Sequence, residues 1–514
     1  MVHRDRRRRT DTVKSRRIMS ILNDAQLEAM RRRLADAGIE VEPQTADTAQ
    51  AAPEPVATDG RLGIPERRMW KIYQLDPESD AHNFAVHLEF GDTYSIQTVV
   101  ASTQRLLASS QVLGSVIEVD DDGTPRRRAE QFDGRWVVPD RVWEWGVIRA
   151  EASATASVSD DRPIAEAVAE AAATLAKTPF RLAEEPAGRI RVIAHDGGVS
   201  LILVLHHLAG DETILPPVLR VLVSDGSDDG EVDWSGGTAV DAPANPAART
   251  DAAIAHAKST WAGSDIRYPL SGNLPDTTPE DSWFSVMGEG PGSRILAPIP
   301  DDRVARLVAF AREVGATPNA LFVVLSALTV SALTDVDDFV LLVPADNRRP
   351  EETVDRVGYS GNIIPMRFTF DRTEQTDAAV RKAVSTVYEA MEYSSVDYGT
   401  ILTALRNSGG RFPVAEVMTL VKNAPLRGVA LPDGAHVTCE AIFKDVVHYP
   451  LSVSFEFDEH DQVHLEVEYR TDVLDDDYAA RTVRVVEDLV AALPDSAQAG
   501  LGELLAQVGA NQAV

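Results

Sequence analysis

The sequence predicts an α/β protein built from two lobes. Stretches with apolar residues at helical spacing alternate with short apolar runs that are typical of strands. Near the middle of the chain, residues 224–246 interrupt this alternation with many Asp, Gly, Ser and Pro residues, which favours a boundary there. No apolar run reaches the roughly 18 residues that would indicate a membrane span, so the apolar residues are expected to fill globular cores.

The chain is expected to begin with segments that lie outside the lobes. Residues 1–18 form a basic tail, which is a targeting arm, a disordered segment, or a translation of sequence upstream of a start at Met19. Residues 19–61 hold a short amphipathic helix followed by a linker rich in Pro, Ala, Thr and Gln. The N-terminal lobe is expected at 62–235 and the C-terminal lobe at 247–514.

Each lobe contains elements that its own pattern predicts. In the first lobe we expect a helix at 164–175 and a hairpin of the apolar runs 189–194 and 199–205 around an Asp-Gly-Gly turn. In the second lobe the patterns predict helices at 301–315, 318–333, 379–391 and 477–493, a buried strand at 339–343, and a hairpin of 451–457 with 463–469.

Charge and cysteine content exclude several classes of function. The first 18 residues carry a net charge of +6, so the rest of the chain carries −36 against the total of −30. Such an acidic body argues against nucleic acid or an anionic membrane as a partner. Cys439 is the single cysteine, which excludes an intrachain disulfide and a zinc cluster, fits a cytoplasmic location, and indicates a buried structural thiol.

The most informative stretch is an apolar strand that ends in two histidines. The strand at 199–205 runs into His206 and His207, and Asp211 follows four residues after the second histidine. Imidazole accepts and returns a proton near neutral pH, and loops at strand ends present reactive groups. Neighbouring strand residues face opposite ways, so we expect His207 to be functional and His206 to be a buried structural residue. Asp211 is expected to pair with an arginine and to shape the loop.

Residues 206–211 resemble the His-His-x-x-x-Asp-Gly signature of the condensation domains of nonribosomal peptide synthetases, which belong to the chloramphenicol-acetyltransferase-like superfamily. Further segments that resemble motifs of this family occur in the family's order, at 67–77, 179–191, 315–321 and 343–367. The resemblance covers residues 62 to 495 and depends on this order more than on any single motif.

The resemblance implies two chloramphenicol-acetyltransferase-like lobes that form a V, with a tunnel at their junction. A carrier protein would deliver an acyl group on phosphopantetheine from one face. A small-molecule or carrier-bound acceptor, an amine or an alcohol, would enter from the other face, and the product would be an amide or an ester. The resemblance implies no metal and no directly bound cofactor, since phosphopantetheine comes with the carrier, and a monomer is expected because one chain builds the whole tunnel.

The family's site residues carry over to matching positions. His207 would take a proton from the nucleophile or hold it in place, and positioning alone lowers a barrier by several kcal/mol. Arg348 matches the arginine that pairs with Asp211, and Arg349 is the alternative register. Asn362 is expected where the second lobe lines the tunnel.

Three departures mark a divergent member. Gly210 lies inside the signature, but Glu212 replaces the motif glycine, and it would narrow the tunnel, reject an acidic acceptor or favour a cationic one. Residues 109–115 lack the two arginines of the family's second motif, and residues 234–246 lack the aromatic motif that follows the signature.

Three functions remain open from the sequence. The first is a stand-alone condensation enzyme, since no adenylation or carrier domain is expected after the last helix. The second is a related acyltransferase that uses a coenzyme A thioester or a lipid alcohol. The third is a catalytically silent module that recruits another protein to a synthetase. His436, His448, His460 and His464 do not make metal-ligand spacing, and surface or packing roles are expected for them.

Overall fold

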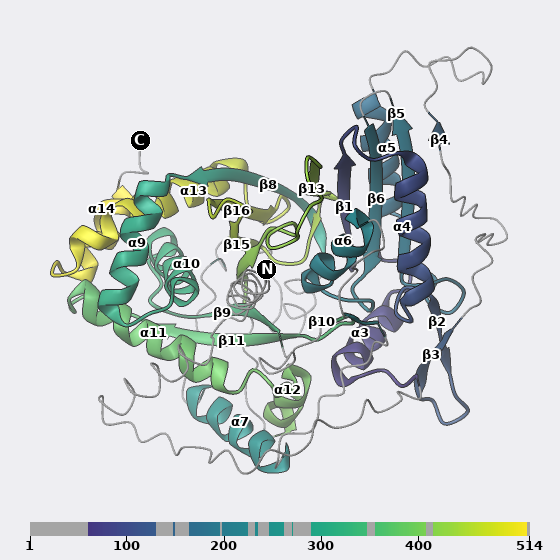
Figure 1. The fold of residues 1–514 in the computed structure, drawn as a ribbon. Helices are drawn as coiled ribbons and strands as arrows, with labels where there is room; N and C mark the ends of the chain where they lie inside the picture. The colour runs from purple at the N-terminus through teal and green to yellow at the C-terminus, as the bar shows by residue number, and fades with distance from the viewer. Residues whose placement is uncertain are drawn as a thin grey trace, which may run out of the picture.

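The computed structural model describes residues 60–129, 148–149, 164–195, 198–224, 232–234, 246–261, 270, 289–346, 355–407 and 415–510. The basic tail, the short helix and most of the linker expected before the first lobe lie outside these ranges. So do Arg348 and Arg349, the arginines expected to pair with Asp211. Figure 1 shows the described part of the chain as two sheets with their helices, side by side.

The N-terminal lobe is a five-stranded sheet in the order β13-β1-β6-β5-β4. Its strands and helices are α3 (Ile64–Leu75), β1 (Asn83–Phe90), α4 (Ile96–Ser109), β4 (Ile148–Arg149), α5 (Ile164–Ala176), β5 (Gly188–His195), β6 (Gly198–His206) and α6 (Leu215–Val223). A small hairpin of β2 (Ser115–Val119) and β3 (Pro125–Ala129) lies beside it. Helices α4 and α5 both contact the sheet, and every residue of β6 after Gly198 is buried, which is typical of a strand covered on both faces. The predicted hairpin is confirmed as β5 and β6.

The C-terminal lobe is a seven-stranded sheet in the order β11-β9-β12-β15-β16-β8-β14. Its strands are β8 (Gly290–Ile299), β9 (Asp338–Asp346), β11 (Gly361–Thr369), β12 (Val417–Asn423), β14 (Val446–Val447), β15 (Leu451–Phe457) and β16 (Val463–Arg470). Its helices are α7 (Pro246–Trp261), α9 (Asp301–Val314), α10 (Pro318–Thr334), α11 (Thr376–Glu392), α12 (Tyr398–Asn407), α13 (Asp476–Ala492) and α14 (Leu501–Ala510). The predicted hairpin of β15 with β16 is confirmed.

Helix α10 is the centre of the second core. It is buried along nearly its whole length and packs against α9, α11, α13 and α14. Gly315 separates it from α9 with a φ of 78°, the left-handed conformation that glycine adopts without steric cost at a helix end. Among the described helices no single one is long and apolar enough to cross a membrane. Helices α9 and α10 would be long and apolar enough if taken together, but they meet at a bend of 100°.

The two lobes exchange main chain. Strand β13 (Val437–Ala441) follows β12 in the second lobe's sequence, yet it pairs antiparallel with β1 at the edge of the first sheet. A second crossing joins β7 (Val232–Asp233) to β10 (Asp355–Arg356) as a short parallel ribbon. Backbone hydrogen bonds therefore fix the lobe junction, where β6 delivers its histidines.

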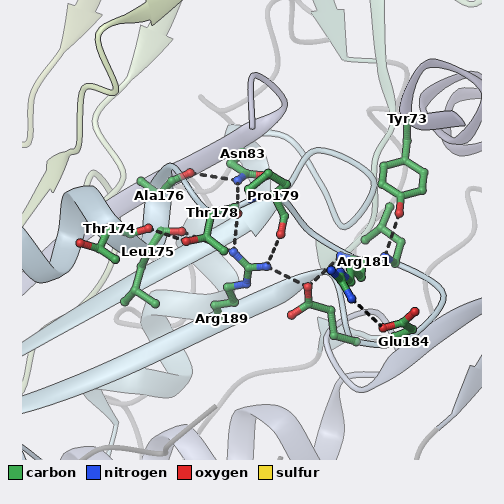
Figure 2. Close-up of polar contacts among 12 residues, drawn as sticks. Tyr73, Asn83, Thr174, Leu175, Ala176, Thr178, Pro179, Arg181, Glu184 and Arg189 are labelled. Atoms are coloured by element: carbon green, nitrogen blue, oxygen red, sulfur yellow. Dashed lines mark hydrogen bonds and ion pairs between the residues drawn. The ribbon is translucent and has the colours of Figure 1, made fainter. Parts of the chain in front are cut away.

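A buried arginine on the neighbouring strand β5 packs close to the His206 end of β6. Arg189 on β5 is 2% exposed, and its guanidinium donates to the carbonyls of Thr178 and Pro179, as Figure 2 shows. It also pairs with the Glu185 carboxylate at 2.8 Å. Its guanidinium lies 3.9 Å from the centre of the Phe180 ring, which in turn contacts the ring of His206.

Replacing Arg189 with Met should lower the free energy of unfolding by about 3–5 kcal/mol, because the Glu185 carboxylate would stay buried without its partner. The double variant Arg189→Met, Glu185→Gln should recover part of this loss. Urea denaturation of the four proteins in a double-mutant cycle measures the coupling. Glu184→Gln serves as the control, since its pair with Arg181 at 3.6 Å is exposed and should change stability by less than about 0.5 kcal/mol. Additive effects of the two buried changes would contradict the pairing.

Candidate active site

The candidate site is built on the turn that ends β6, residues 206–211, which we call the signature turn. His206 is the last residue of the strand, and the backbone N–H of His207 donates to the carbonyl of His82 at 2.8 Å. Ala209 and Gly210 then donate to the carbonyls of His206 and His207, which closes the turn. The turn is thereby held by the residue that precedes β1, and the His207 side chain is fixed at the edge of the first sheet.

The ring of His207 is oriented by the turn itself. Its Nδ1 lies 3.2 Å from the carbonyl oxygen of Gly210. A carbonyl oxygen only accepts, so Nδ1 carries the proton and the neutral ring keeps a lone pair on Nε2. Burial lowers the pKa of His207 below its ordinary 6.5, while Asp211 and the Gly210 carbonyl act in the opposite direction. His207 is therefore neutral at pH 7 and can accept a proton at Nε2.

His206 has a different environment, as the alternation along the strand predicts. It is 2% exposed, and its Nδ1 accepts a hydrogen bond from the backbone N–H of Leu208 at 3.0 Å. Its ring packs edge-on against Tyr73 and Phe180. Burial and the charge of His207 lower the pKa of His206 to about 3. His206 thus stays neutral and acts as a packing residue that fixes the turn.

Side chains from both lobes surround His207. Phe84 of β1 and Tyr359 of the second lobe place their rings 5.3 and 5.8 Å from the His207 ring. The His82 ring lies 6.4 Å away on another side and stacks on the ring of His448 at 4.9 Å. His207 therefore lies half-buried at the junction of the lobes, between aromatic rings.

Asp211 connects the two lobes at this point. Its Oδ1 caps the short helical turn Glu212–Ile214 by accepting from the backbone N–H of Thr213 at 3.1 Å. Its Oδ2 accepts from the backbone N–H of Ser360, in the second lobe, at 3.2 Å. Asp211 is thus held by backbone groups of both lobes, and its expected arginine partner lies outside the described residues.

Asn362 holds the second lobe's side of the junction through four hydrogen bonds. Its Nδ2 donates to the carbonyls of Ser394 and Val396, at 2.7 and 2.8 Å. Its Oδ1 accepts from the backbone N–H of Tyr398 and from the guanidinium of Arg68 on α3. Arg68 also donates to the carbonyl of Gly361 at 2.6 Å and pairs with Asp397. Asn362 is 3% exposed, so in this structure it ties together the walls of the junction.

Comparisons with known proteins agree with this geometry. Residues 279–508 match the family described as condensation domain. Phosphinothricin tripeptide synthetase PhsB of Streptomyces viridochromogenes is 25% identical over 400 residues, which are 74% of this chain and 32% of PhsB. The chain thus spans about a third of the length of this curated relative.

Solved structures match nearly the whole described chain. The condensation domain from the monacolin K polyketide synthase MokA aligns with a TM-score of 0.69 at 14% identity, over 86% of this chain and 98% of that domain. This is the condensation-domain fold, and it agrees with the match of residues 279–508 to the condensation-domain family. The starter condensation domain of rhizomide synthetase RzmA, a mutant in complex with C8-CoA, aligns with a TM-score of 0.66 at 15% identity, over 86% of this chain and 96% of that one.

Glu212 extends from the helical turn after Asp211 toward the second lobe. It is the first residue of the helical turn after Asp211, and its Oε1 lies 3.8 Å from the Nζ of Lys422 on β12. Gly210 is buried, and a Cβ at its position would lie 3.0 Å from the side chain of Ile214. A side chain at 210 would therefore press on Ile214, whereas position 212 has room for a glutamate.

Two residues of the site have no motif in the sequence. A surface or packing role was expected for His448, and its Nε2 donates to the carbonyl of Ala81 at 3.2 Å, beside His82. Lys444 donates to the same carbonyl at 3.0 Å and to that of Asp80. Both residues belong to the segment after β13. The pairing of β13 with β1 therefore places them beside the loop before β1, whose His82 carbonyl binds the backbone of His207. Among the described residues, no group of three or more His, Cys, Asp or Glu could hold a metal ion.

The buried histidines should make stability depend on pH below 6.5. Burial and neighbouring positive charge lower the pKa of His82 to about 2, of His206 to about 3 and of His448 to about 4. Each histidine has a pKa near 6.5 in the unfolded chain, so below that pH the unfolded state binds more protons than the folded state. Their contribution to stability is complete above pH 6.5 and falls as the pH decreases, by up to about 1.4 kcal/mol per pH unit for each histidine.

This dependence can be measured by urea denaturation at pH 7.5, 6.5 and 5.5. His448→Gln keeps a donor for the Ala81 carbonyl but cannot gain the proton, so its loss of stability between pH 6.5 and 5.5 should be smaller than that of the wild type. His460→Gln, at an exposed turn, should retain the wild-type dependence. An equal dependence in all three proteins would show that His448 is not held neutral.

Proposed function

We propose that this condensation domain is an acyltransferase of nonribosomal peptide or related natural-product biosynthesis. It transfers an acyl or aminoacyl group from the phosphopantetheine thioester of a carrier protein to an amine or an alcohol, and the product is an amide or an ester. The observation that supports this most directly is the hydrogen bond of His207 Nδ1 to the Gly210 carbonyl, because it leaves Nε2 as a proton acceptor at the lobe junction.

The reaction needs only groups that the substrates and His207 supply. The nucleophile's nitrogen or oxygen attacks the thioester carbonyl carbon, a C–N or C–O bond forms, and the C–S bond breaks. Nε2 of His207 takes the proton from the nucleophile and returns it to the leaving sulfur, so the products are the acyl transfer product and the free phosphopantetheine thiol. An α-amine has a reference pKa near 8, so a neutral base beside it assists the attack at pH 7.

A coenzyme A thioester is the second candidate donor. RzmA, whose starter condensation domain shares this fold, was solved in complex with C8-CoA. Coenzyme A ends in the same phosphopantetheine arm as a carrier protein, so the chemistry at His207 would be unchanged. The two donors differ in one respect, since a carrier protein must dock on the surface at the entrance of the junction and coenzyme A need not.

Acyl transfer should be detectable by intact-protein mass spectrometry. A phosphopantetheinylated carrier protein, loaded in turn with acyl and aminoacyl groups, is incubated with the chain and with amine and alcohol acceptors. The wild type should unload the carrier and form product, and His207→Ala should lower the rate by about 100-fold or more, since general base catalysis typically contributes that much. The same acyl groups on coenzyme A test the second donor.

The control for this experiment is His460→Ala, because His460 is an exposed histidine in the turn between β15 and β16. It should transfer at the wild-type rate. If His207→Ala transfers as fast as the wild type, His207 is not the base. If no protein transfers any group while all of them bind the carrier equally, the chain is a recruiting module instead of an enzyme.

The pH dependence of kcat/KM, calculated for the unprotonated acceptor, should report His207. Because burial lowers the pKa of His207, the neutral base is present above pH 6.5 and activity should fall only below that value. Asp211 raises the pKa of His207, so Asp211→Asn should move the acidic limb to still lower pH. A limb above pH 6.5, or an upward shift in Asp211→Asn, would contradict the assignment of His207 as the base.

A further inference from the structure

One face of the second sheet carries polar side chains although it lies inside the molecule. On β15, Val453 and Phe455 point into the hydrophobic core with the helices. Side chains alternate along a strand, so the residues between them point to the opposite face. The side chains that share this opposite face, which we call the carboxylate face, are Ser452, Ser454 and Glu456 on β15 and Glu466 and Glu468 on β16.

Several groups on the carboxylate face have no protein partner. Ser452 and Ser454 are 8% and 6% exposed, and neither hydroxyl makes a hydrogen bond within the described part of the chain. Glu468, directly opposite Ser452 across the two strands, likewise makes no hydrogen bond or close ion pair there. None of these oxygens is a fully buried atom left unpaired, so two hydroxyls and a carboxylate on one surface are open to a ligand that donates hydrogen bonds.

The carboxylate face also has an excess of negative charge. Lys422 and Arg294 are cations on this face, and Lys422 Nζ lies 3.0 Å from Glu466 and 3.5 Å from Glu456. Arg294 also pairs with Glu466, at 3.2 Å. With Glu212 and Glu468 counted, four carboxylates face three cations, Lys422, Arg294 and Lys444, and Arg470 of β16 pairs with Asp472. Burial and the charge of Glu466 raise the pKa of Glu468 to about 7, as expected where positive charge is lacking.

The carboxylate face is turned toward the signature turn. Glu212, five residues after His207, reaches across the junction to Lys422 on this face. At the other end of the face, burial lowers the pKa of Lys444, and the charge of Glu468 acts in the opposite direction. Lys444 in turn donates to the carbonyl of Ala81, next to His82, whose own carbonyl binds the backbone of His207. A molecule that lies along the carboxylate face therefore extends away from His207 within the junction.

We propose that the carboxylate face binds a primary ammonium group of the acceptor, so that the acceptor is a diamine or an amino acid with a basic side chain. An ammonium has three donors and no acceptor, and the face offers it the Glu468 carboxylate and the hydroxyls of Ser452 and Ser454. The other amine of the same molecule is then the nucleophile at His207. This inference deepens the proposed function and rests on it for the role of His207.

The test compares 1,5-diaminopentane with 1-aminopentane, which have the same carbon chain and differ by one amino group. Isothermal titration calorimetry should show that the wild type binds the diamine about tenfold more tightly, as one charge-assisted hydrogen bond to a buried carboxylate implies. Glu468→Gln should bind both amines equally. Glu313→Gln removes a negative charge from an exposed position on α9, which packs on the core side of the sheet, and should keep the preference.

Transfer measurements separate this inference from the proposed function. His207→Ala should keep the tenfold preference in binding while losing transfer. If the wild type prefers the diamine in binding but transfers to neither amine, the ammonium site stands and the proposed function fails. If the wild type and Glu468→Gln acylate both amines with equal kcat/KM, the function stands and the ammonium site is overturned.

A second variant protects the test against loss of fold. Ser452→Ala removes one hydroxyl from the carboxylate face without changing its charge, and should weaken diamine binding while leaving binding of the monoamine unchanged. If Ser452→Ala binds the diamine as tightly as the wild type, and Glu468→Gln unfolds, the face is an ion-pair contact between the lobes and no acceptor site.

Discussion

The pairing of β13 with β1 is the constraint on which the site depends. It places main chain of the second lobe at the edge of the first sheet, where β13 pairs with β1. Strand β1 pairs on its other side with β6, which ends in His206. The chain that leaves β13 brings Lys444 and His448 onto the carbonyls before His82, and the His82 carbonyl holds the backbone of His207. The position of His207 is thus set by both lobes, and a change in their relative position would move its ring.

Desolvation explains why several histidines gather at the junction without becoming charged. His82 and His448 stack with their rings 4.9 Å apart, which two protonated imidazoles would not tolerate. Desolvation keeps both neutral and also lowers the pKa of His207, and Asp211 is the charged group that acts to raise the pKa of His207. Asp211 can do this because Thr213 and Ser360 fix its carboxylate in place.

The sequence was sufficient for the parts of the site that lie within one short segment. His206, His207 and Asp211 follow a buried strand in order, and alternation along that strand separates the packing histidine from the one proposed as the base. His82, His448 and Tyr359 could not be found this way, because their contacts with the turn come from the sheet order, and a strand's pattern does not name its partner. The same reason kept β13 from being placed in the first sheet, since its residues resemble any half-buried strand.

Glu212 shows how a departure from a motif has to be judged by its surroundings. A glycine is favoured where the backbone has a positive φ or where a side chain would crowd a neighbour, and at Gly210 a Cβ would lie 3.0 Å from Ile214. Position 212 begins a helical turn that Asp211 already caps, so its backbone suits any residue. Its carboxylate extends to Lys422, which Glu456 and Glu466 already contact. Glu212 therefore leaves the turn of His207 intact and adds charge to the wall opposite it.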